Sequence, residues 1–174
     1  MGTLYVKNFK VDMKPSLMNY MKRGWVLNCS IAIDFTLSNG PITDLKSKHR
    51  QDKRRVDEMN QYEKAIYEIG SVLQKYAFQG DFVMYGFGGI PRYLGKNYQC
   101  KSEQELQQAV KCWNLAGELP PAELALGKEL KVVGTMGALG IYHKAVNNTT
   151  FAGPTYFSGI LKRFLKSVQL GMQL

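Results

Sequence analysis

The sequence predicts an α/β protein with a mainly parallel central sheet and helices on both faces of that sheet. Two observations lead to this fold class. Residues 25–33 form a continuous apolar, β-branched run, which is typical of a strand buried on both faces. Such strands then alternate along the chain with amphipathic helical segments, as in βαβ units. A chain of 174 residues is long enough for one domain with a sizeable core, so we expect a single domain over residues 1–174.

The first half of the chain supplies most of this pattern. Residues 4–11 alternate weakly and predict an edge strand, and Ser16 opens a short helix that Gly24 ends. The strand over 25–33 runs directly into a polar turn, residues 34–40. A long helix follows, in which apolar residues recur at steps of three and four. These residues are Tyr62, Ala65, Ile66, Ile69, Val72, Leu73 and Tyr76.

The second half begins with a short strand over 82–85, closed by the glycine-rich turn 86–89. We expect a polar helix near 102–110, a break at Pro120 and Pro121, and a long connection around them. Residues 131–133 form a short strand or the lead-in to a helix over 136–146. A final amphipathic helix covers 156–168.

The net charge of +9 is high for a domain of this size. Such a charge attracts acidic partners, although a run of basic residues is also the ordinary composition of a solvated loop. Aromatic residues do not interleave with the basic ones, so we expect no nucleic-acid partner. The basic residues gather at Lys46, Lys48, Arg50, Lys53, Arg54 and Arg55, and again at Lys162, Arg163 and Lys166.

The cysteines predict a reducing compartment. Cys29, Cys100 and Cys112 are odd in number and lack the paired spacing of a zinc site. The chain does not open on a secretory signal, and no apolar run approaches the roughly 18 residues that span a bilayer. We therefore expect reduced thiols and a cytoplasmic location.

One constellation carries chemistry. Asp34, Thr36 and Ser38 stand at the carboxyl end of the predicted buried strand, where open parallel sheets bind ligands. Their spacing of two lets three side-chain oxygens project toward one point, and hard oxygens suit Mg²⁺. One carboxylate leaves such an ion under-neutralised, so it should recruit an anionic oxygen from a partner. Polar turns are also rich in Asp, Thr and Ser for purely local reasons.

The remaining sequence patterns give little support for an enzyme. Gly134, Gly137 and Gly140 suggest a nucleotide-binding enzyme, but the close first pair of a dinucleotide motif is missing, and helix packing explains the glycines equally well. Neither His49 nor His143 pairs in the sequence with a nucleophile, and no paired carboxylates suggest acid–base catalysis. We expect a binding domain and not an enzyme.

Several segments, taken in order, resemble the von Willebrand factor A-type domain of the copine family. Residues 32–40 resemble the first metal-binding loop of that domain, and residues 16–24 resemble the short helix that precedes it. Residues 60–66 resemble its first long helix, residues 85–89 its Gly-Phe-Gly strand end, and residues 153–155 (Gly-Pro-Thr) its second metal loop. The related domain of RING ubiquitin ligases shares the metal-loop and Gly-Pro-Thr motifs, whereas residues 16–24 favour the copine family.

The resemblance implies a Rossmann-like von Willebrand factor A domain that mediates protein interactions. It implies a metal-ion-dependent adhesion site that takes Mg²⁺ or Mn²⁺, adds Thr155 to the ligands Asp34, Thr36 and Ser38, and captures an acidic residue of a protein partner. In the family, two calcium-dependent phospholipid-binding modules precede this domain and bring the whole protein to membranes. This chain does not carry them, so we expect only an indirect link to membranes. No feature predicts the oligomeric state.

Two departures from the family pattern affect these expectations. The family continues into a buried strand that ends in Asp-Gly, the third metal loop, whereas this sequence stops at Leu174. We therefore expect a domain that is incomplete at its C-terminus and belongs to a longer protein. The segment 99–131 is also longer than the resemblance predicts.

Overall fold

A computed structural model describes residues 2–51, 58–92, 111–117 and 119–171. Its centre is a parallel pair of strands, β1 (Leu27–Asp34) and β2 (Ala77–Phe87). The register runs from Cys29 opposite Phe82 to Asp34 opposite Phe87. Two short strands, β4 (Trp113–Asn114) and β5 (Val132–Val133), pair antiparallel with β2, so the sheet is mixed. The α/β class predicted from the sequence is confirmed, with the parallel pair as the longest pairing.

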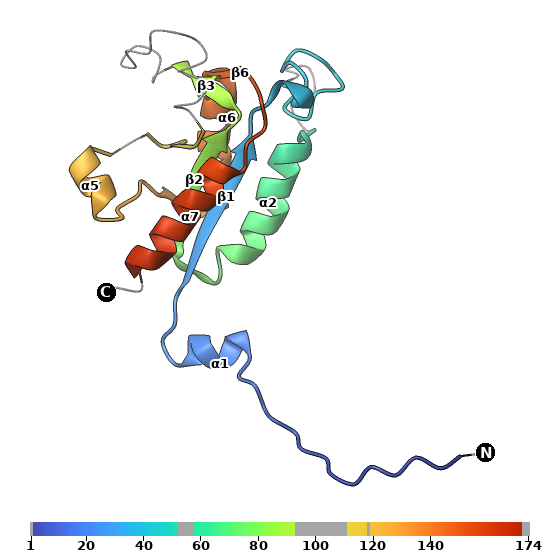
Figure 1. Ribbon diagram of the computed structural model, residues 1–174. Coiled ribbons are helices and arrows are strands. Elements are labelled where there is room, and N and C mark those ends of the chain that lie inside the picture. The colour runs from blue at the N-terminus through green and yellow to red at the C-terminus, as the bar shows by residue number, and fades with distance from the viewer. Residues whose placement is uncertain (1, 52–57, 93–110, 118, 172–174) are drawn as a thin grey trace.

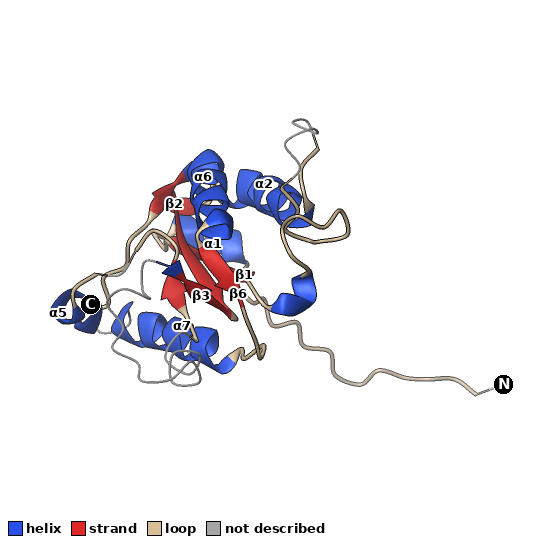
Figure 2. Ribbon diagram, turned by 90° about the horizontal axis from the view of Figure 1, so that it is seen from above, coloured by secondary structure: helices blue, strands red, loops and turns tan. Residues whose placement is uncertain are grey.

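Helices cover both faces of the sheet, as predicted. The helices α2 (Gln61–Leu73) and α6 (Gly134–Asn147) pack together on one face, and α7 (Ser158–Gly171) lies on the other (Figures 1 and 2). Strand β2 contributes side chains to the cores on both faces of the sheet, because successive side chains of a strand point in opposite directions. Phe82 and Met84 belong to the large core beneath α2 and α6, whereas Tyr85 and Phe87 cluster with Ile160 of α7.

The carboxyl ends of β1 and β2 are covered by further short elements. A 3₁₀ turn, η1 (Leu37–Asn39), follows β1, and β3 (Gly89–Pro91) continues from β2. β3 pairs antiparallel with β6 (Thr149–Phe151), the strand after α6 (Figure 1). Three segments far apart in the sequence therefore meet at one edge of the sheet.

The N-terminal segment corrects one expectation. Residues 4–11 form no strand, and Leu4 is 91% exposed. An alternating pattern becomes a strand only when a neighbour pairs with its backbone, and among the described residues nothing pairs with this one. The chain then enters α1 (Leu17–Lys22), where Ser16 and Asn19 cap each other's backbone as predicted for a helix start.

The C-terminal half gives a second correction. Helix α5 (Pro121–Ala125) begins where a break was expected. Proline is favoured in the first turn of a helix, since its missing N–H has no partner there in any case, so the second proline of the pair starts α5. The helix expected near 102–110 and the residue Cys100 lie outside the described residues. Within the described residues, Cys29 and Cys112 form no disulfide. No helix in the described part of the chain is long and apolar enough to cross a membrane.

Candidate cation site

The candidate site begins where β1 ends. Asp34 is the last residue of β1, and its Oδ1 accepts a hydrogen bond of 2.9 Å from the backbone N–H of Thr36. This contact turns the chain, so that Thr36 stands just before η1 and Ser38 lies within it. The hydroxyl oxygens of Thr36 and Ser38 lie 3.0 Å apart. The structure thus brings together three of the four residues that the sequence singled out.

A second segment reaches the same edge from β2. The backbone N–H of Phe35 donates to the carbonyl of Phe87 at 2.8 Å, which extends the parallel pairing to the strand ends. Gly88 follows with φ +73°, and a Cβ placed on it would lie 2.2 Å from the Thr36 Cγ2 and 3.2 Å from the Asp34 Oδ1. Only glycine allows this close approach, which accounts for the Gly-Phe-Gly turn.

The third segment follows β6. Ala152 forms a parallel bridge with Thr36, accepts a hydrogen bond of 2.8 Å from the Leu37 N–H and donates one of 3.1 Å to the Gly88 carbonyl. Ala152 therefore lies between the other two segments. Thr155 lies three residues further on and is exposed. Among the described residues, no hydrogen bond joins Thr155 to Asp34, Thr36 or Ser38, so its role as a ligand stays a prediction.

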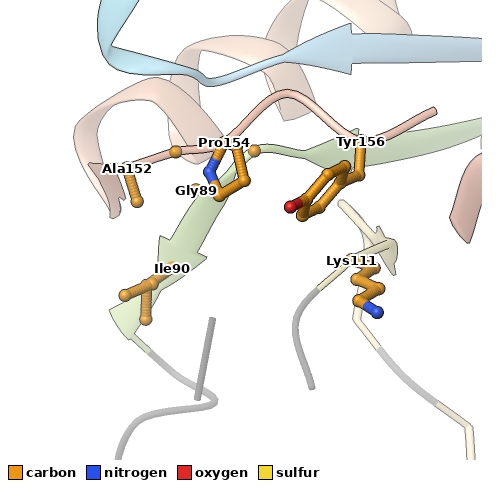
Figure 3. A pocket seen from close by; sticks show the side chains of 8 residues that line it. Gly89, Ile90, Lys111, Ala152, Pro154 and Tyr156 are labelled. Atoms are coloured by element: carbon orange, nitrogen blue, oxygen red, sulfur yellow. The ribbon is translucent and has the colours of Figure 1, made fainter. Parts of the chain in front are cut away.

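Beside this junction lies a small pocket, walled by β3 and by the segment that contains the Gly153–Pro154 peptide (Figure 3). Lys111 and Tyr156 stand together at one side of it, with the Lys111 Nζ 5.9 Å from the centre of the Tyr156 ring. Tyr156 is 53% exposed. A positive charge and an exposed aromatic ring therefore lie next to the segment that carries Thr155.

The loop that follows β1, residues 34–39, is called the cation loop below, and hydrogen bonds from core residues hold its backbone. The Asp34 carbonyl accepts hydrogen bonds from His49 Nε2 at 2.7 Å and from Asn39 Nδ2 at 3.1 Å. The hydroxyl of Tyr62, on α2, lies 3.3 Å from the same carbonyl and 3.1 Å from Asn39 Oδ1. Asn39 also donates to the Thr36 carbonyl at 3.1 Å. The loop is consequently tied to the core at both ends.

Burial sets the protonation of these supporting groups. Burial lowers the pKa of His49, although the hydrogen bond to Asp34 opposes this. Burial raises the pKa of Tyr62 to about 12, and the nearby negative charge of Asp34 adds to that effect. Both side chains are therefore neutral near pH 7, and Tyr62 keeps the proton that it donates.

His49 was not identified from the sequence as part of the site. It lies in a basic stretch whose composition predicts a solvated loop, yet its side chain is fully buried. The neighbouring Lys46 and Lys48 are exposed as expected, and Arg50 pairs with Glu58 at 2.8 Å. Lys53, Arg54 and Arg55 lie outside the described residues. One sequence offers no signal that a single histidine turns inward from such a run.

Gly134, the first glycine of α6, is explained by its backbone conformation, whereas a Cβ at Gly137 would make only ordinary contacts and one at Gly140 would meet nothing within 4 Å. Gly134 has φ +65°, and the next residue, Thr135, donates both its N–H and its hydroxyl to Gln74 Oε1, at 3.0 and 2.9 Å. This helix start follows β5, which pairs with Asp81 and Phe82 in the middle of β2, away from the carboxyl edge of the sheet. Gln74 thus occupies donors that a pyrophosphate would need, which argues against nucleotide binding at this helix start.

The donor set suits a hard divalent cation. In the described part of the chain, no group of three or more His, Cys, Asp or Glu side chains is placed to hold a metal ion. Asp34, Thr36 and Ser38 offer one carboxylate and two hydroxyls, a set too poor in nitrogen and sulfur for zinc or copper. Neighbouring ligands of an octahedral Mg²⁺, each about 2.1 Å from the ion, are about 3.0 Å apart. The two hydroxyls have this spacing.

A mixed α/β sheet with an Asp-x-Thr-x-Ser turn at its carboxyl edge fits the class of von Willebrand factor A-type domains. Within this class, the family model of the copines matches residues 51–173. The chain belongs to the copine family. This membership decides between the two parents considered from the sequence, copine and RING ubiquitin ligase.

Individual relatives agree. Protein BONZAI 2 of Arabidopsis thaliana is 32% identical over 91% of the chain. Nicotinic receptor-associated protein 1 of Caenorhabditis elegans is 29% identical over 97% of the chain, and Copine-B of Dictyostelium discoideum is 28% identical over 92%. The matches cover 23%, 23% and 25% of these relatives, so the chain spans about a quarter of their length.

Proposed function

We propose that this copine-like protein-interaction domain binds Mg²⁺ or Mn²⁺ through Asp34, Thr36 and Ser38, and uses the ion to capture an acidic residue of a protein partner. The observation that carries the proposal is the 3.0 Å spacing of the two hydroxyls beside the Asp34 carboxylate. The match to the family model begins at residue 51 and so lies after this loop. The metal role therefore rests on the geometry of the loop itself.

The partner's acidity follows from charge. One carboxylate neutralises half of a divalent cation, and the two hydroxyls contribute no charge. The bound ion would keep a net positive charge on a chain that already carries +9. A carboxylate from the partner would complete both the coordination and the charge. Thr155 would join the ligands when the partner is bound.

The relatives support an interaction role rather than catalysis. The name of the Caenorhabditis elegans relative records an association with a nicotinic receptor. We extend to this chain only the general feature, a protein partner. A cytoplasmic location, and a link to membranes through other parts of a longer protein, belong to the same proposal.

Calorimetry with Mg²⁺ and Mn²⁺ tests the site. We expect Asp34→Ala to abolish the heat of binding, since it removes the charged ligand. Asp44→Ala is a matched control, because Asp44 Oδ1 also accepts a hydrogen bond of 2.9 Å from the N–H two residues on, at Lys46, within the same loop region. Asp44→Ala should bind as the wild type does. Equal heats of binding from the wild type and Asp34→Ala would rule out a cation site at Asp34.

Capture of an acidic residue needs its own experiment. A library of random heptapeptides with Glu or Asp fixed at the centre is compared with the same library carrying Gln or Asn there. We expect the acidic library to be retained on the domain in Mg²⁺ and released by EDTA. Equal retention of the two libraries, or retention that persists in EDTA, would contradict the proposed capture.

A further inference from the structure

His49 occupies an unusual place for a polar residue. Its side chain is fully buried, stacked on the ring of Tyr62 at 4.0 Å with an angle of 9° and on that of Phe35 at 5.4 Å with an angle of 6°. Phe151, on β6, meets it edge-on at 5.0 Å. The ring thus touches the loop after β1, helix α2 and strand β6, the elements around the cation loop.

The two ring nitrogens have defined tasks. Nε2 lies 2.7 Å from the Asp34 carbonyl, which can only accept, so Nε2 carries a proton and donates it. Nδ1 lies 2.9 Å from the hydroxyl of Tyr142, on α6. In the neutral ring Nδ1 can only accept, so Tyr142 donates to it at 2.9 Å, the shorter of the two contacts of this hydroxyl, whose other partner is Asn60 Oδ1 at 3.3 Å. The contact fixes both the tautomer and the orientation of the ring.

The contact to Asp34 matters because of where that peptide lies. The Asp34 carbonyl points into the core, while the carboxylate of the same residue faces the cation loop. A hydrogen bond that fixes the position of the carbonyl therefore also fixes the backbone of Asp34, from which the carboxylate side chain extends. Metal sites require their ligands within about 0.5 Å of the productive position, and outer contacts that orient ligands change affinity by roughly 10- to 100-fold.

We propose that His49 is a positioning residue of the cation site, oriented by Tyr142 and acting through the backbone of Asp34. The inference rests on the proposed function, since it assigns a support to the same site. It adds that the affinity for the cation depends on a residue that contacts none of the ligating oxygens. Tyr142 and His49 then form a path from helix α6 to the loop.

The experiment compares two buried tyrosines in the full chain. Tyr142→Phe removes the hydroxyl that orients His49, together with its longer contact to Asn60, and leaves the aromatic ring in place. Tyr85→Phe is the matched control, since Tyr85 is equally buried and also loses a hydrogen bond, to Glu129, on the α7 face. We expect similar losses in the urea midpoint for both variants. The Kd for Mg²⁺ should rise about tenfold in Tyr142→Phe alone.

Substitutions of His49 give a rescue. His49→Phe keeps an aromatic ring in the stack but lacks the donor, and it should raise the Kd for Mg²⁺ by about tenfold or more. His49→Gln offers an N–H at a similar distance along the side chain and should recover part of that loss. Wild-type affinity in both Tyr142→Phe and His49→Phe, with only stability reduced, would overturn the proposal.

A measurement without metal separates this inference from the proposed function. Amide hydrogen exchange at Thr36, whose N–H bonds the Asp34 carboxylate, reports on the loop in EDTA. Exchange there should accelerate in Tyr142→Phe and His49→Phe but not in Tyr85→Phe. If the wild type binds no Mg²⁺, the proposed function fails, whereas the exchange result still shows whether His49 orders the loop at Thr36. Unchanged exchange at Thr36 in the two variants would refute its positioning role.

Discussion

Asp34 shows how one residue serves the core and the site together. Its carbonyl receives donors from His49 and Asn39 inside the protein, and its carboxylate receives the Thr36 N–H on the outer side. The buried carbonyl needs its partners, because an unsatisfied buried acceptor costs about 1–3 kcal/mol. Stability of the fold and shape of the candidate site are consequently coupled at this single peptide.

Gly88 allows a prediction at the same scale. A methyl group at this position would overlap Thr36 Cγ2, and the backbone φ of +73° is unfavourable for alanine. We expect Gly88→Ala to lower the free energy of unfolding by about 2–4 kcal/mol, the sum of strain and overpacking. It should also abolish Mg²⁺ binding, because Thr36 must move. Urea unfolding and calorimetry measure the two effects.

Gly80→Ala is the control for backbone strain. Gly80 has φ +70°, but a Cβ there would meet only the Gln74 carbonyl, at an ordinary distance of 3.5 Å. It lies near the start of β2, far from the carboxyl end of that strand, where Gly88 follows. We expect a loss of about 1 kcal/mol from strain and unaltered Mg²⁺ binding. Equal effects of the two substitutions would mean that contact with Thr36 has no special weight.

At the scale of elements, an ion pair between α7 and the connection before β5 adds to the apolar contacts that hold α7 in place. Arg163 donates from Nε and Nη2 to the two oxygens of Glu129, at 2.9 and 2.8 Å. Its guanidinium also lies over the ring of Tyr85, 5.0 Å from the centre. Both charged side chains are mostly buried, with 18% and 13% of their area exposed. This arrangement joins helix, connection and strand.

Arg163→Met tests this attachment. The substitution keeps an apolar stem but leaves the Glu129 charge without its cationic partner in a mostly buried place. We expect a loss of about 3 kcal/mol in the free energy of unfolding. Lys64→Met on α2 breaks an exposed pair with Glu68 of 3.9 Å and should cost less than about 1 kcal/mol. Urea titrations of the two variants compare them directly, and equal losses would contradict the weight given to Arg163.

At the scale of the whole molecule, buried tyrosines link stability to alkaline pH. Burial raises the pKa of Tyr85 and of Tyr142 well above the usual 10. Above pH 10 the unfolded chain therefore loses these protons while the folded chain keeps them, so stability falls as the pH rises. Tyr62, whose pKa burial raises to about 12, behaves in the same way, so with three such groups the loss is at most about 4.1 kcal/mol per pH unit.

Urea unfolding between pH 8 and pH 11 measures this dependence. We expect a plateau below about pH 9.5 and a steep decline above pH 10. Tyr85→Phe should start from a lower plateau but decline about one third less steeply, because one of the three linked tyrosine protons is gone. The same slope in the wild type and the variant would show that Tyr85 ionises freely in the folded protein.

Much of the fold could be predicted from the sequence, because its signals are local. The three- and four-residue spacing from Tyr62 onward predicted α2, and the apolar run before Asp34 predicted β1. The weak alternation over 4–11 was misleading, since pairing depends on a neighbour that the pattern itself does not specify. Pro121 begins a helix where a break was expected because the same residue suits both a helix start and a turn.

The candidate site was predictable only in part, for a related reason. The spacing of Asp34, Thr36 and Ser38 is local, and the structure brings their side chains together. The inward turn of His49 depends on Tyr142, which is 93 residues away. Such long-range contacts leave no trace in the composition around a residue, and the charged neighbours of His49 pointed the other way. The ligand role of Thr155 stays a prediction.

The anchoring of the Asp34 peptide has a thermodynamic consequence. A loop that becomes ordered only around its ion must give up conformational entropy at that moment, which weakens the observed affinity. Here the entropy has already been lost during folding, through the contacts with Asn39, Tyr62 and His49. An arriving ion would meet a receptor that is already rigid, so its binding would be governed by dehydration of the ion and would leave the shape of the domain unchanged.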